Sequence, residues 1–323
     1  MQPQTKHRLR QLPLLALALA SLSACSTSSQ QPAPSDRLLS FVDPFIGTGE
    51  HGHTFPGATR PNAMVQFSPD THLIGWDASS GYHATDSTIY AFSLTHLSGT
   101  GVGDLGDVAV LPYSGVDSLK PVARFAKKDE KASPGYYAVE LANFGIRTEL
   151  TSTERVGLMR ATYSDSTDRK LLLDLGHILQ PNWGHKVVGN DLELVNDSTI
   201  RGTYYTKGWA EHHQLSYTLH LSRPVDSLTL WRNGQRSRIE AGYSTSLGTK
   251  DSVASLICVS ACRMLISRPV TRITSRIGDA VVISVSRAWR PMVSTVSGVM
   301  SQSSLPGSPP AGSSRQPART VPA

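Results

Sequence analysis

The sequence lacks several features that mark common classes of protein. Cysteine is scarce: Cys25 stands alone before position 258, and Cys258 and Cys262 form a CxxxC pair without other ligand residues beside it. A lone pair of this kind is weak evidence of function, and we do not interpret it as a metal or redox site. No segment keeps a helical apolar stripe for three turns, and no repeat of fixed period is present. These absences favour a β-rich fold.

An apolar run near the N-terminus, residues 12–22, is about as long as the core of a signal peptide and too short to span a bilayer as a helix. It follows three cationic residues and ends in Leu-Ser-Ala-Cys, which resembles the lipobox of bacterial lipoproteins. We therefore expect residues 1–24 to be a lipoprotein signal peptide. Acylated Cys25 would then anchor an exported chain to a membrane of the cell envelope, in the outer membrane or periplasm. The alternative is an ordinary cleaved signal with an incidental cysteine. Residues 25–36 are polar and Pro/Ser-rich, which predicts a flexible tether.

Positive charge is concentrated at the C-terminus. The formal net charge is +6, but residues 253–323 contain eight arginines, no lysine, no glutamate and one acid, Asp279, and so carry +7. The mature body, residues 25–252, is therefore about −4, and we expect no nucleic-acid partner for it. We interpret residues 251–323 as an atypical, disordered tail. It is either a basic extension that binds nucleic acid or envelope polymer or, as we favour, the product of a change of reading frame near position 250.

Residues 37–250 are expected to form a large antiparallel β-sandwich. Strand-like, mostly alternating segments occur at residues 135–141, 146–153, 157–163, 170–175 and 215–221. Residues 192–195 and 198–205 flank Asn196-Asp197, a pair that suits a hairpin turn. Turn residues recur at intervals of about ten residues, which is typical of a sandwich.

Residues 41–115 are rich in glycine, histidine and aromatic residues, as in loops that place side chains at a surface. His51 and His53, in Gly-His-Gly-His, would point the same way on a strand and could ligate a transition metal. No Asp, Glu or Cys stands at a helpful spacing, however, so we favour hydrogen-bonded loop histidines and predict no metal site. The segment Gly101–Gly106 matches GxGxxG, but the residues after it read as a strand, which argues against a dinucleotide site.

A third chemistry in this segment is sugar binding. Trp76-Asp77 and Gly81-Tyr82-His83 combine an aromatic face with short polar groups. An aromatic ring can stack on the C–H face of a pyranose while polar groups bond its hydroxyls. The alternative is that Trp76 is a core residue.

Several consecutive motifs of this segment resemble those of a known family. The stretches VDPFIGTGEHGHTFPGAT, MVQFSPDT, WDASSGYH and SLTHLSGTGVGDLGDVAVLP are similar, in this order, to the N-terminal domain of family 92 glycoside hydrolases. Weaker likeness continues to about Gly248. Members of this family are bacterial exo-α-mannosidases, many of them α-1,2-specific and calcium-dependent. This sequence departs from the family at Ala78, where a second tryptophan is usual, and at residues 60–64, where Pro-Phe-Gly-Met is common.

The resemblance has implications for chemistry. In the family, a helical (α/α)₆ barrel, which lies outside this sequence, supplies the general acid, the general base and the calcium ligands of an inverting mechanism. We therefore expect no catalytic residue in this chain and neither calcium nor another cofactor. The expected partners are mannose-containing glycans. The residues expected nearest the sugar, all as binding groups, are Trp76, Asp77, Gly81, Tyr82, His83, His96 and Ser98.

Two functional hypotheses follow from the sequence. The first is the N-terminal, carbohydrate-facing domain of a surface α-mannosidase, as a truncated and inactive fragment. The second is a stand-alone glycan-binding lipoprotein. We favour the first, because a selected binding module should have a sequence-coherent C-terminus and residues 251–323 do not.

Overall fold

The computed structural model describes residues 38–99, 101–115, 118, 120–165, 169–248, 255–260 and 279–288. All of them lie in one unit, Met1–Trp289. The signal peptide, Cys25 and the tether lie outside the described residues, so the predictions about them are not tested by this structure. Among the described residues, no helix has the length and apolar character needed to cross a membrane.

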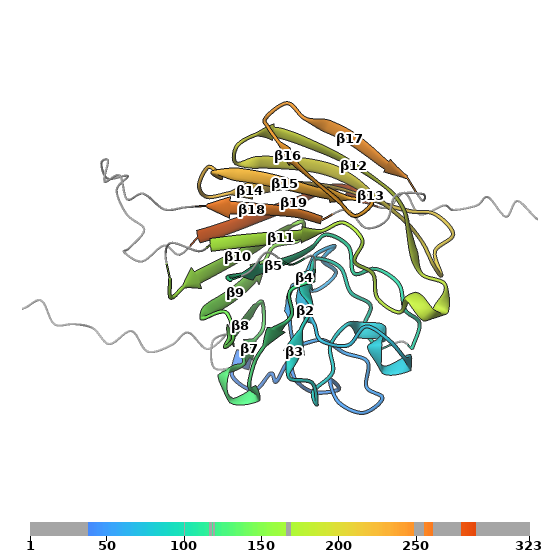
Figure 1. Ribbon diagram of the computed structural model, residues 1–323. Helices are drawn as coiled ribbons and strands as arrows, with labels where there is room; N and C mark the ends of the chain where they lie inside the picture. The colour runs from blue at the N-terminus through green and yellow to red at the C-terminus, as the bar shows by residue number, and fades with distance from the viewer. Residues whose placement is uncertain are drawn as a thin grey trace, which may run out of the picture. The chain divides into compact units, whose positions relative to one another are not determined.

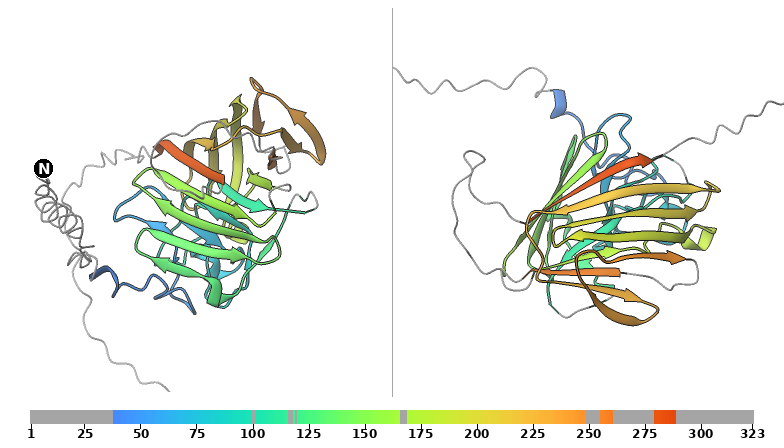
Figure 2. Two further views of the ribbon diagram at one scale, coloured as in Figure 1. Left: turned by 90° about the vertical axis from the view of Figure 1, so that its left-hand side faces the viewer. Right: turned by 90° about the horizontal axis from the view of Figure 1, so that it is seen from above.

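Two large antiparallel sheets make up most of the fold (Figures 1 and 2). The eight-stranded sheet has the order β1 (Ala58–Thr59), β2 (Gln66–Asp70), β4 (Ala91–Ser93), β5 (Ala109–Tyr113), β11 (Arg169–Asp174), β18 (Ser255–Ser260), β15 (Ser227–Arg232) and β16 (Gln235–Ile239). The nine-stranded sheet has the order β17 (Ser244–Gly248), β12 (Lys186–Asn196), β13 (Thr199–Lys207), β14 (His213–Leu221), β19 (Asp279–Ala288), β10 (Val156–Tyr163), β9 (Ile146–Ser152), β8 (Tyr136–Leu141) and β7 (Lys131–Ser133).

Short elements connect these strands. The strands β3 (Thr88–Ile89) and β6 (Ala123–Arg124) form a small separate sheet. From β1 onward, the described residues contain three short 3₁₀ helices: η1 (Trp76–Ser80), η2 (Lys127–Asp129) and η3 (Pro181–Trp183). The strand segments predicted from the sequence are therefore confirmed. Their boundaries shift by one or two residues, except that β12 begins six residues before the predicted start at 192.

One apolar core lies between the two large sheets. Along β9 and β14, buried and less buried residues alternate, so each strand turns one face inward. The core joins Phe67 and Val110 of the eight-stranded sheet to Leu150 and Leu219 of the nine-stranded sheet. This arrangement is the predicted large antiparallel β-sandwich.

The hairpin predicted around residue 196 is present, with its turn one residue later than expected. Asn196 pairs with Thr199, so Asp197 and Ser198 form the turn between β12 and β13. The Asn196 Oδ1 accepts hydrogen bonds from the backbone N–H and the hydroxyl of Ser198. Asn196 thus stabilises the turn from its first position, as asparagine commonly does.

The prediction of a disordered tail after residue 250 is wrong for two segments. Strand β18 pairs with β11 and β15, and β19 pairs with β10 and β14. Val281, Ile283 and Val285 alternate along β19 and are buried in the core. Composition averaged over the whole tail concealed this local period of two. The rest of residues 251–323, including Cys262, lies outside the described residues.

Candidate functional site

A tight loop presents two histidines to one carboxylate. Its ends close through a hydrogen bond from the Thr54 N–H to the Gly47 carbonyl. A Cβ on Gly52 would lie 2.0 Å from the Gly47 oxygen, so only glycine fits there. His53 adopts a left-handed conformation, with φ of 52°. The loop is not a strand, yet its geometry turns both imidazoles, of His51 and His53, toward the same partner.

That partner is Asp77, in the 3₁₀ turn η1. Its Oδ1 lies 2.8 Å from His51 Nδ1 and 3.0 Å from His53 Nε2. The hydrogen bond from His51 is the largest influence on the pKa of Asp77 and, with His53, holds it below its ordinary value against the effect of desolvation. The interpretation as hydrogen-bonded loop histidines is therefore confirmed. Their partner could not be found from spacing, because the fold brings Asp77 to them from 24 and 26 positions away.

Trp76 covers this group and faces solvent. Its ring centroid lies 4.8 Å from that of His51 and 4.6 Å from that of His53, and 48% of the residue is exposed. It is therefore not a core residue. A Cβ on Gly101 would lie 1.9 Å from Trp76 Nε1, so the backbone of the glycine-rich loop packs directly against the indole. The glycines of the GxGxxG match serve close packing, and β5 follows them as the sequence predicted.

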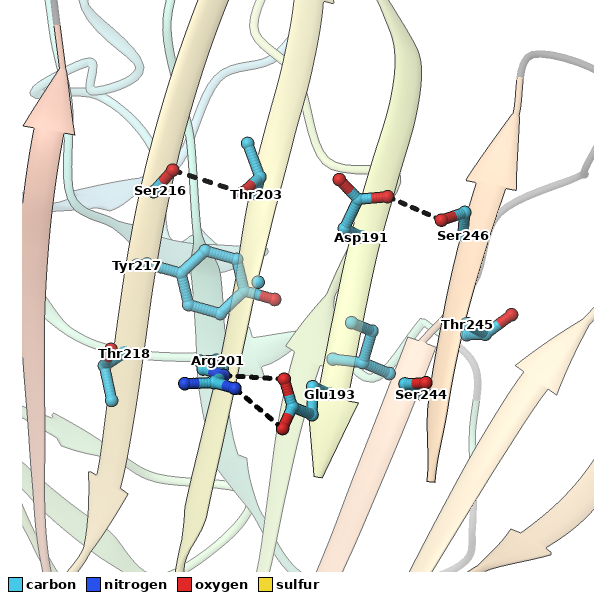
Figure 3. A pocket seen from close by; sticks show the side chains of 12 residues that line it. Asp191, Glu193, Arg201, Thr203, Ser216, Tyr217, Thr218, Ser244, Thr245 and Ser246 are labelled. Atoms are coloured by element: carbon cyan, nitrogen blue, oxygen red, sulfur yellow. Dashed lines mark hydrogen bonds and ion pairs between the residues drawn. The ribbon is translucent and has the colours of Figure 1, made fainter. Parts of the chain in front are cut away.

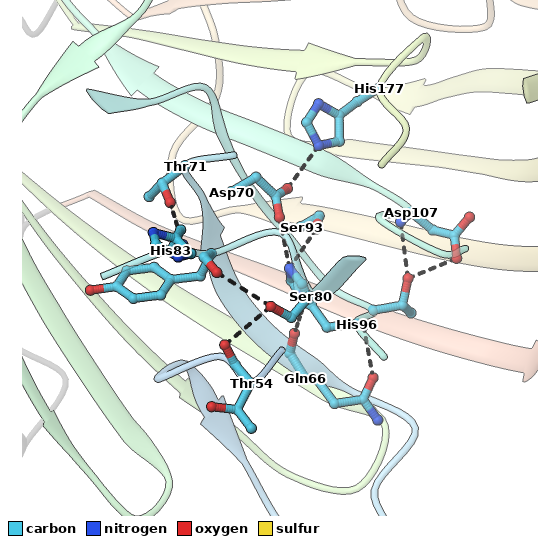
Figure 4. Close-up of polar contacts among 12 residues, drawn as sticks. Thr54, Gln66, Asp70, Thr71, Ser80, His83, Ser93, His96, Asp107 and His177 are labelled. Carbon is cyan, nitrogen blue, oxygen red and sulfur yellow. Dashed lines mark hydrogen bonds and ion pairs between the residues drawn. The ribbon is translucent and has the colours of Figure 1, made fainter. Parts of the chain in front are cut away.

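Beneath this surface, one buried carboxylate joins two histidines (Figure 4). Asp70 Oδ1 lies 2.7 Å from His96 Nε2, and Asp70 Oδ2 lies 2.7 Å from His177 Nε2. Burial alone would raise the pKa of Asp70, but the two histidines outweigh it and lower the pKa to about 2. Burial would lower the pKa of His177, but Asp70 outweighs it and raises that pKa.

The ring of His96 has a hydrogen-bond partner on each side. Its Nδ1 lies 2.7 Å from the Gln66 carbonyl oxygen, which can only accept a hydrogen bond. Its Nε2 lies 2.7 Å from Asp70 Oδ1 and 3.2 Å from Ser93 Oγ. These contacts fix the orientation of the imidazole. A Cβ on Gly81 would lie 2.3 Å from Asp70 Oδ1, so this glycine permits the close approach.

Two further aspartate–histidine pairs fasten distant loops in the same way. Asp107 Oδ2 accepts hydrogen bonds from Thr95 Oγ1 and from His213 Nε2, at 2.7 and 2.8 Å. Burial opposes the protonation of His213, but Asp107 outweighs it and raises the pKa. Asp104 accepts a hydrogen bond from the backbone N–H of Ala210 and lies 3.2 Å from His185. Asp104 thus bonds the backbone and a buried histidine from within the glycine-rich loop.

A fourth buried carboxylate, Glu130, organises the region around Tyr82. The hydroxyls of Tyr82 and Tyr137 donate to its two oxygens at 2.9 and 2.7 Å, and Lys127 Nζ lies 2.8 Å from the Tyr82 hydroxyl. Burial, followed by Glu130, raises the pKa of Tyr82, so the phenol stays protonated. Tyr82 is 1% exposed and points into the protein.

The structure separates the seven predicted sugar-binding residues into two groups. Trp76, Asp77, His83 and Ser98 are at least partly exposed, and direct contact with a sugar stays a prediction for them. Gly81, Tyr82 and His96 are buried and bonded to or packed against protein groups. In the structure these three residues position the loops, and contact with a sugar stays an untested prediction for them as well.

Sequence reasoning missed the groups that support the site. Asp70, Asp107, His177 and His213 are all buried and ionically paired in the structure. The sequence did contain a signal. Asp70 ends one strand and His177 comes three residues after another, both within stretches that resemble the family. Nothing in the sequence, however, indicates which aspartate pairs with which histidine.

A second hollow lies on the outward face of the nine-stranded sheet (Figure 3). It is an open groove of about 640 Å³ lined by polar residues of β12, β13, β14 and β17. Its two carboxylates already have partners: Glu193 binds Arg201 through two hydrogen bonds, and Asp191 accepts from Ser246 and Tyr205. This satisfied network favours a structural role for the groove.

The fold and the site together define a β-sandwich domain with an exposed aromatic and polar surface around Trp76 and Asp77. Residues 41–260 match the glycosyl hydrolase family 92 N-terminal domain. Because this match spans well over half of the sequence, the chain belongs to glycoside hydrolase family 92. The domain therefore extends at least ten residues beyond the boundary of 250 expected from the sequence.

Solved structures of this family are similar to the chain. The family GH92 α-mannosidase BT3965 from Bacteroides thetaiotaomicron, in complex with mannoimidazole, is 32% identical, with a TM-score of 0.66, over 77% of this chain and 32% of that one. The inverting mannosidase BT2199 from the same organism shares the fold at 19% identity, with a TM-score of 0.58 over 77% of this chain and 31% of that one.

A curated relative matches a shorter stretch. An uncharacterized secreted glycosidase from Arthroderma benhamiae is 34% identical over 131 residues, which is 38% of this chain and 17% of that protein. The chain thus spans about a third of the length of the solved relatives and less of this one.

Proposed function

We propose that this chain is the N-terminal, carbohydrate-facing domain of an exported α-mannosidase, and that Trp76 and its neighbours contact the mannoside. The observation behind this proposal is the half-exposed indole of Trp76 beside the hydrogen-bonded carboxylate of Asp77. An indole face suits the C–H face of a pyranose, and charge-assisted hydrogen bonds suit its hydroxyls.

Relatives support the choice of ligand and compartment. The similar enzyme BT3965 is an α-mannosidase with mannoimidazole bound, and the similar fungal protein is a secreted glycosidase. Because the chain spans only part of these proteins, substrate and export are proposals for it.

The chain's own residues would bind and orient the sugar. His51 and His53 hold Asp77 in place, and the Gly101 backbone fixes the indole. The buried Asp70 bridge, with His96 and His177, keeps the supporting loops in register below. In an inverting glycosidase, the hydrolytic step itself needs a carboxylic acid and a carboxylate separated by room for a water molecule. We assign neither role to Asp77, whose accepting oxygen is occupied by two histidines.

Binding tests this proposal. The purified 323-residue chain should bind methyl α-mannoside weakly in titration calorimetry. Replacing Trp76 by alanine should abolish the signal, because the stacking face is removed. Trp209→Ala is the matched control, since Trp209 is 75% exposed and lies between β13 and β14. Equal loss in both variants, or unchanged binding in Trp76→Ala, would overturn the proposal.

An activity assay addresses the proposed state of the chain. We propose that it is a truncated, inactive fragment, so it should not hydrolyse α-1,2-mannobiose. Turnover by the purified chain would refute this. Reading the gene in its other frames downstream of codon 250 then distinguishes a fragment, for which barrel sequence should follow, from a stand-alone glycan-binding lipoprotein.

The membrane anchor remains part of the proposal. If Cys25 is acylated, the mature chain should partition into detergent and show a diacylglyceryl mass increment at its N-terminus. A Cys25→Ser variant should lose both properties. An unmodified, water-soluble mature chain would instead indicate ordinary secretion.

A further inference from the structure

We propose that His51, His53 and Asp77 bind a divalent transition-metal ion of the zinc class. The potential ligand atoms of these three residues all lie within 4.8 Å of one another. Two of the separations, 2.8 and 3.0 Å, are between an imidazole nitrogen and the same carboxylate oxygen. Ligand atoms around a tetrahedral zinc ion, each at about 2.1 Å from it, stand about 3.4 Å apart. To admit an ion, the two contacts with Asp77 would open by a few tenths of an ångström, and the two imidazole nitrogens, which lie within 4.8 Å of each other, would approach that separation.

The ligand types select the class of metal. Two imidazoles with one carboxylate suit zinc and neighbouring transition metals, whereas calcium prefers oxygen ligands. Metal binding requires each facing ring nitrogen to present its lone pair in place of the N–H that now donates to Asp77. In each neutral imidazole the proton then moves to the other ring nitrogen, so the histidine changes tautomer and stays neutral when it binds the metal.

The surroundings hold the ligands in place. His53 is nearly buried, and its carbonyl accepts a 2.7 Å hydrogen bond from the Gly99 N–H. The Trp76 ring contacts both imidazoles and restricts their rotation. Support of this kind lowers the conformational entropy that metal binding would otherwise remove.

Exposure distinguishes this group from the buried aspartate–histidine pairs. The side chain of His51 is 68% exposed and that of Asp77 is 30% exposed, so an ion can enter and keep water as its remaining ligand. In the Asp70 bridge, by contrast, the side chains of Asp70 and His96 are fully buried. Among the histidine-containing groups of the described residues, the set at Asp77 therefore combines three ligands with access.

Metal titration tests the inference directly. The 323-residue chain, purified without a histidine tag, is titrated with Zn²⁺ by calorimetry and with Cu²⁺ by tryptophan fluorescence. We expect one ion per chain. Bound Cu²⁺ should quench part of the emission, because Trp76 lies beside both histidine ligands. A Trp76→Phe variant should bind zinc as before and lose most of this quenching.

Variants assign the ligands. His51→Ala and Asp77→Asn should each weaken zinc binding at least tenfold, and the exposed position of His51 makes misfolding of the first variant a minor concern. His72→Ala is the matched control: His72 also pairs with one aspartate, Asp86, but belongs to no such three-ligand group. The inference fails if the wild-type chain binds no zinc, or if His51→Ala binds as tightly as His72→Ala.

Discussion

Replacing Asp70 by asparagine should destabilise the domain more than any surface charge substitution. Asp70 is wholly buried and accepts a hydrogen bond from each of His96 and His177. Asparagine keeps the shape but removes the charge and one of the two acceptors. His177, whose raised pKa favours the charged form, would then be a buried cation without its counter-ion.

The expected cost follows from the burial. Removing one partner of a buried ion pair costs about 3–5 kcal/mol, because the remaining charge is left uncompensated. For a domain of this size, that loss lowers the melting temperature by on the order of 10 °C. Glu193→Gln is the control: Glu193 pairs with Arg201 at the surface, where such a pair contributes about 0–1 kcal/mol.

Thermal and urea unfolding of both variants, followed by circular dichroism, measure the difference. The reasoning predicts a clear shift for Asp70→Asn and almost none for Glu193→Gln. Equal shifts, or a loss below about 1 kcal/mol for Asp70→Asn, would show that the bridge from Asp70 to His96 and His177 contributes little.

Further predictions concern pH, packing and the last strand. Stability should be greatest between about pH 4 and 6. The stability that ionised Asp70 contributes is complete above its ordinary pKa of 3.8 and is lost as the pH falls toward its folded pKa of about 2, whereas the stability that protonated His177 contributes is complete below its ordinary pKa of 6.5 and is lost as the pH rises through its raised folded pKa. A urea midpoint that does not change from pH 3 to 8 would contradict this. Gly101→Ala should displace the Trp76 indole, because the alanine Cβ would overlap Trp76 Nε1, and the tryptophan emission should shift. Unchanged emission would argue against close packing of residue 101 on the indole. Ending the chain at residue 278 should cause aggregation, seen by light scattering, because β10 and β14 would lose the strand between them; a monomeric product would show that β19 is dispensable.

The sequence was sufficient to predict the fold class and the strands from β8 to β14. Alternation of apolar and polar residues is a local property, and it located β8, β9, β10 and β14 correctly. It failed for β19, where an arginine-rich, acid-poor composition was given more weight than the alternation of Val281, Ile283 and Val285.

The site was predictable only in part. The motif around Trp76 and Asp77 indicated a surface region, and the structure places both residues there. The pairing of Asp77 with His51 and His53 depends on how two loops close, which no spacing rule specifies. Burial of Tyr82 and His96 was likewise invisible, because a tyrosine or histidine in a polar motif has the same local signature inside and outside the protein.

The buried bridges have a consequence for the order of folding. Asp70 and Asp107 lie early in the chain, yet their histidine partners follow 107 and 106 residues later. A chain emerging N-terminus first has therefore displayed its entire aromatic loop region before His177 and His213 arrive to lock it. Contacts of such long sequence separation form slowly. We expect the ligand-facing loops to be among the last parts to become rigid, although residues 41–115 are among the first to be made.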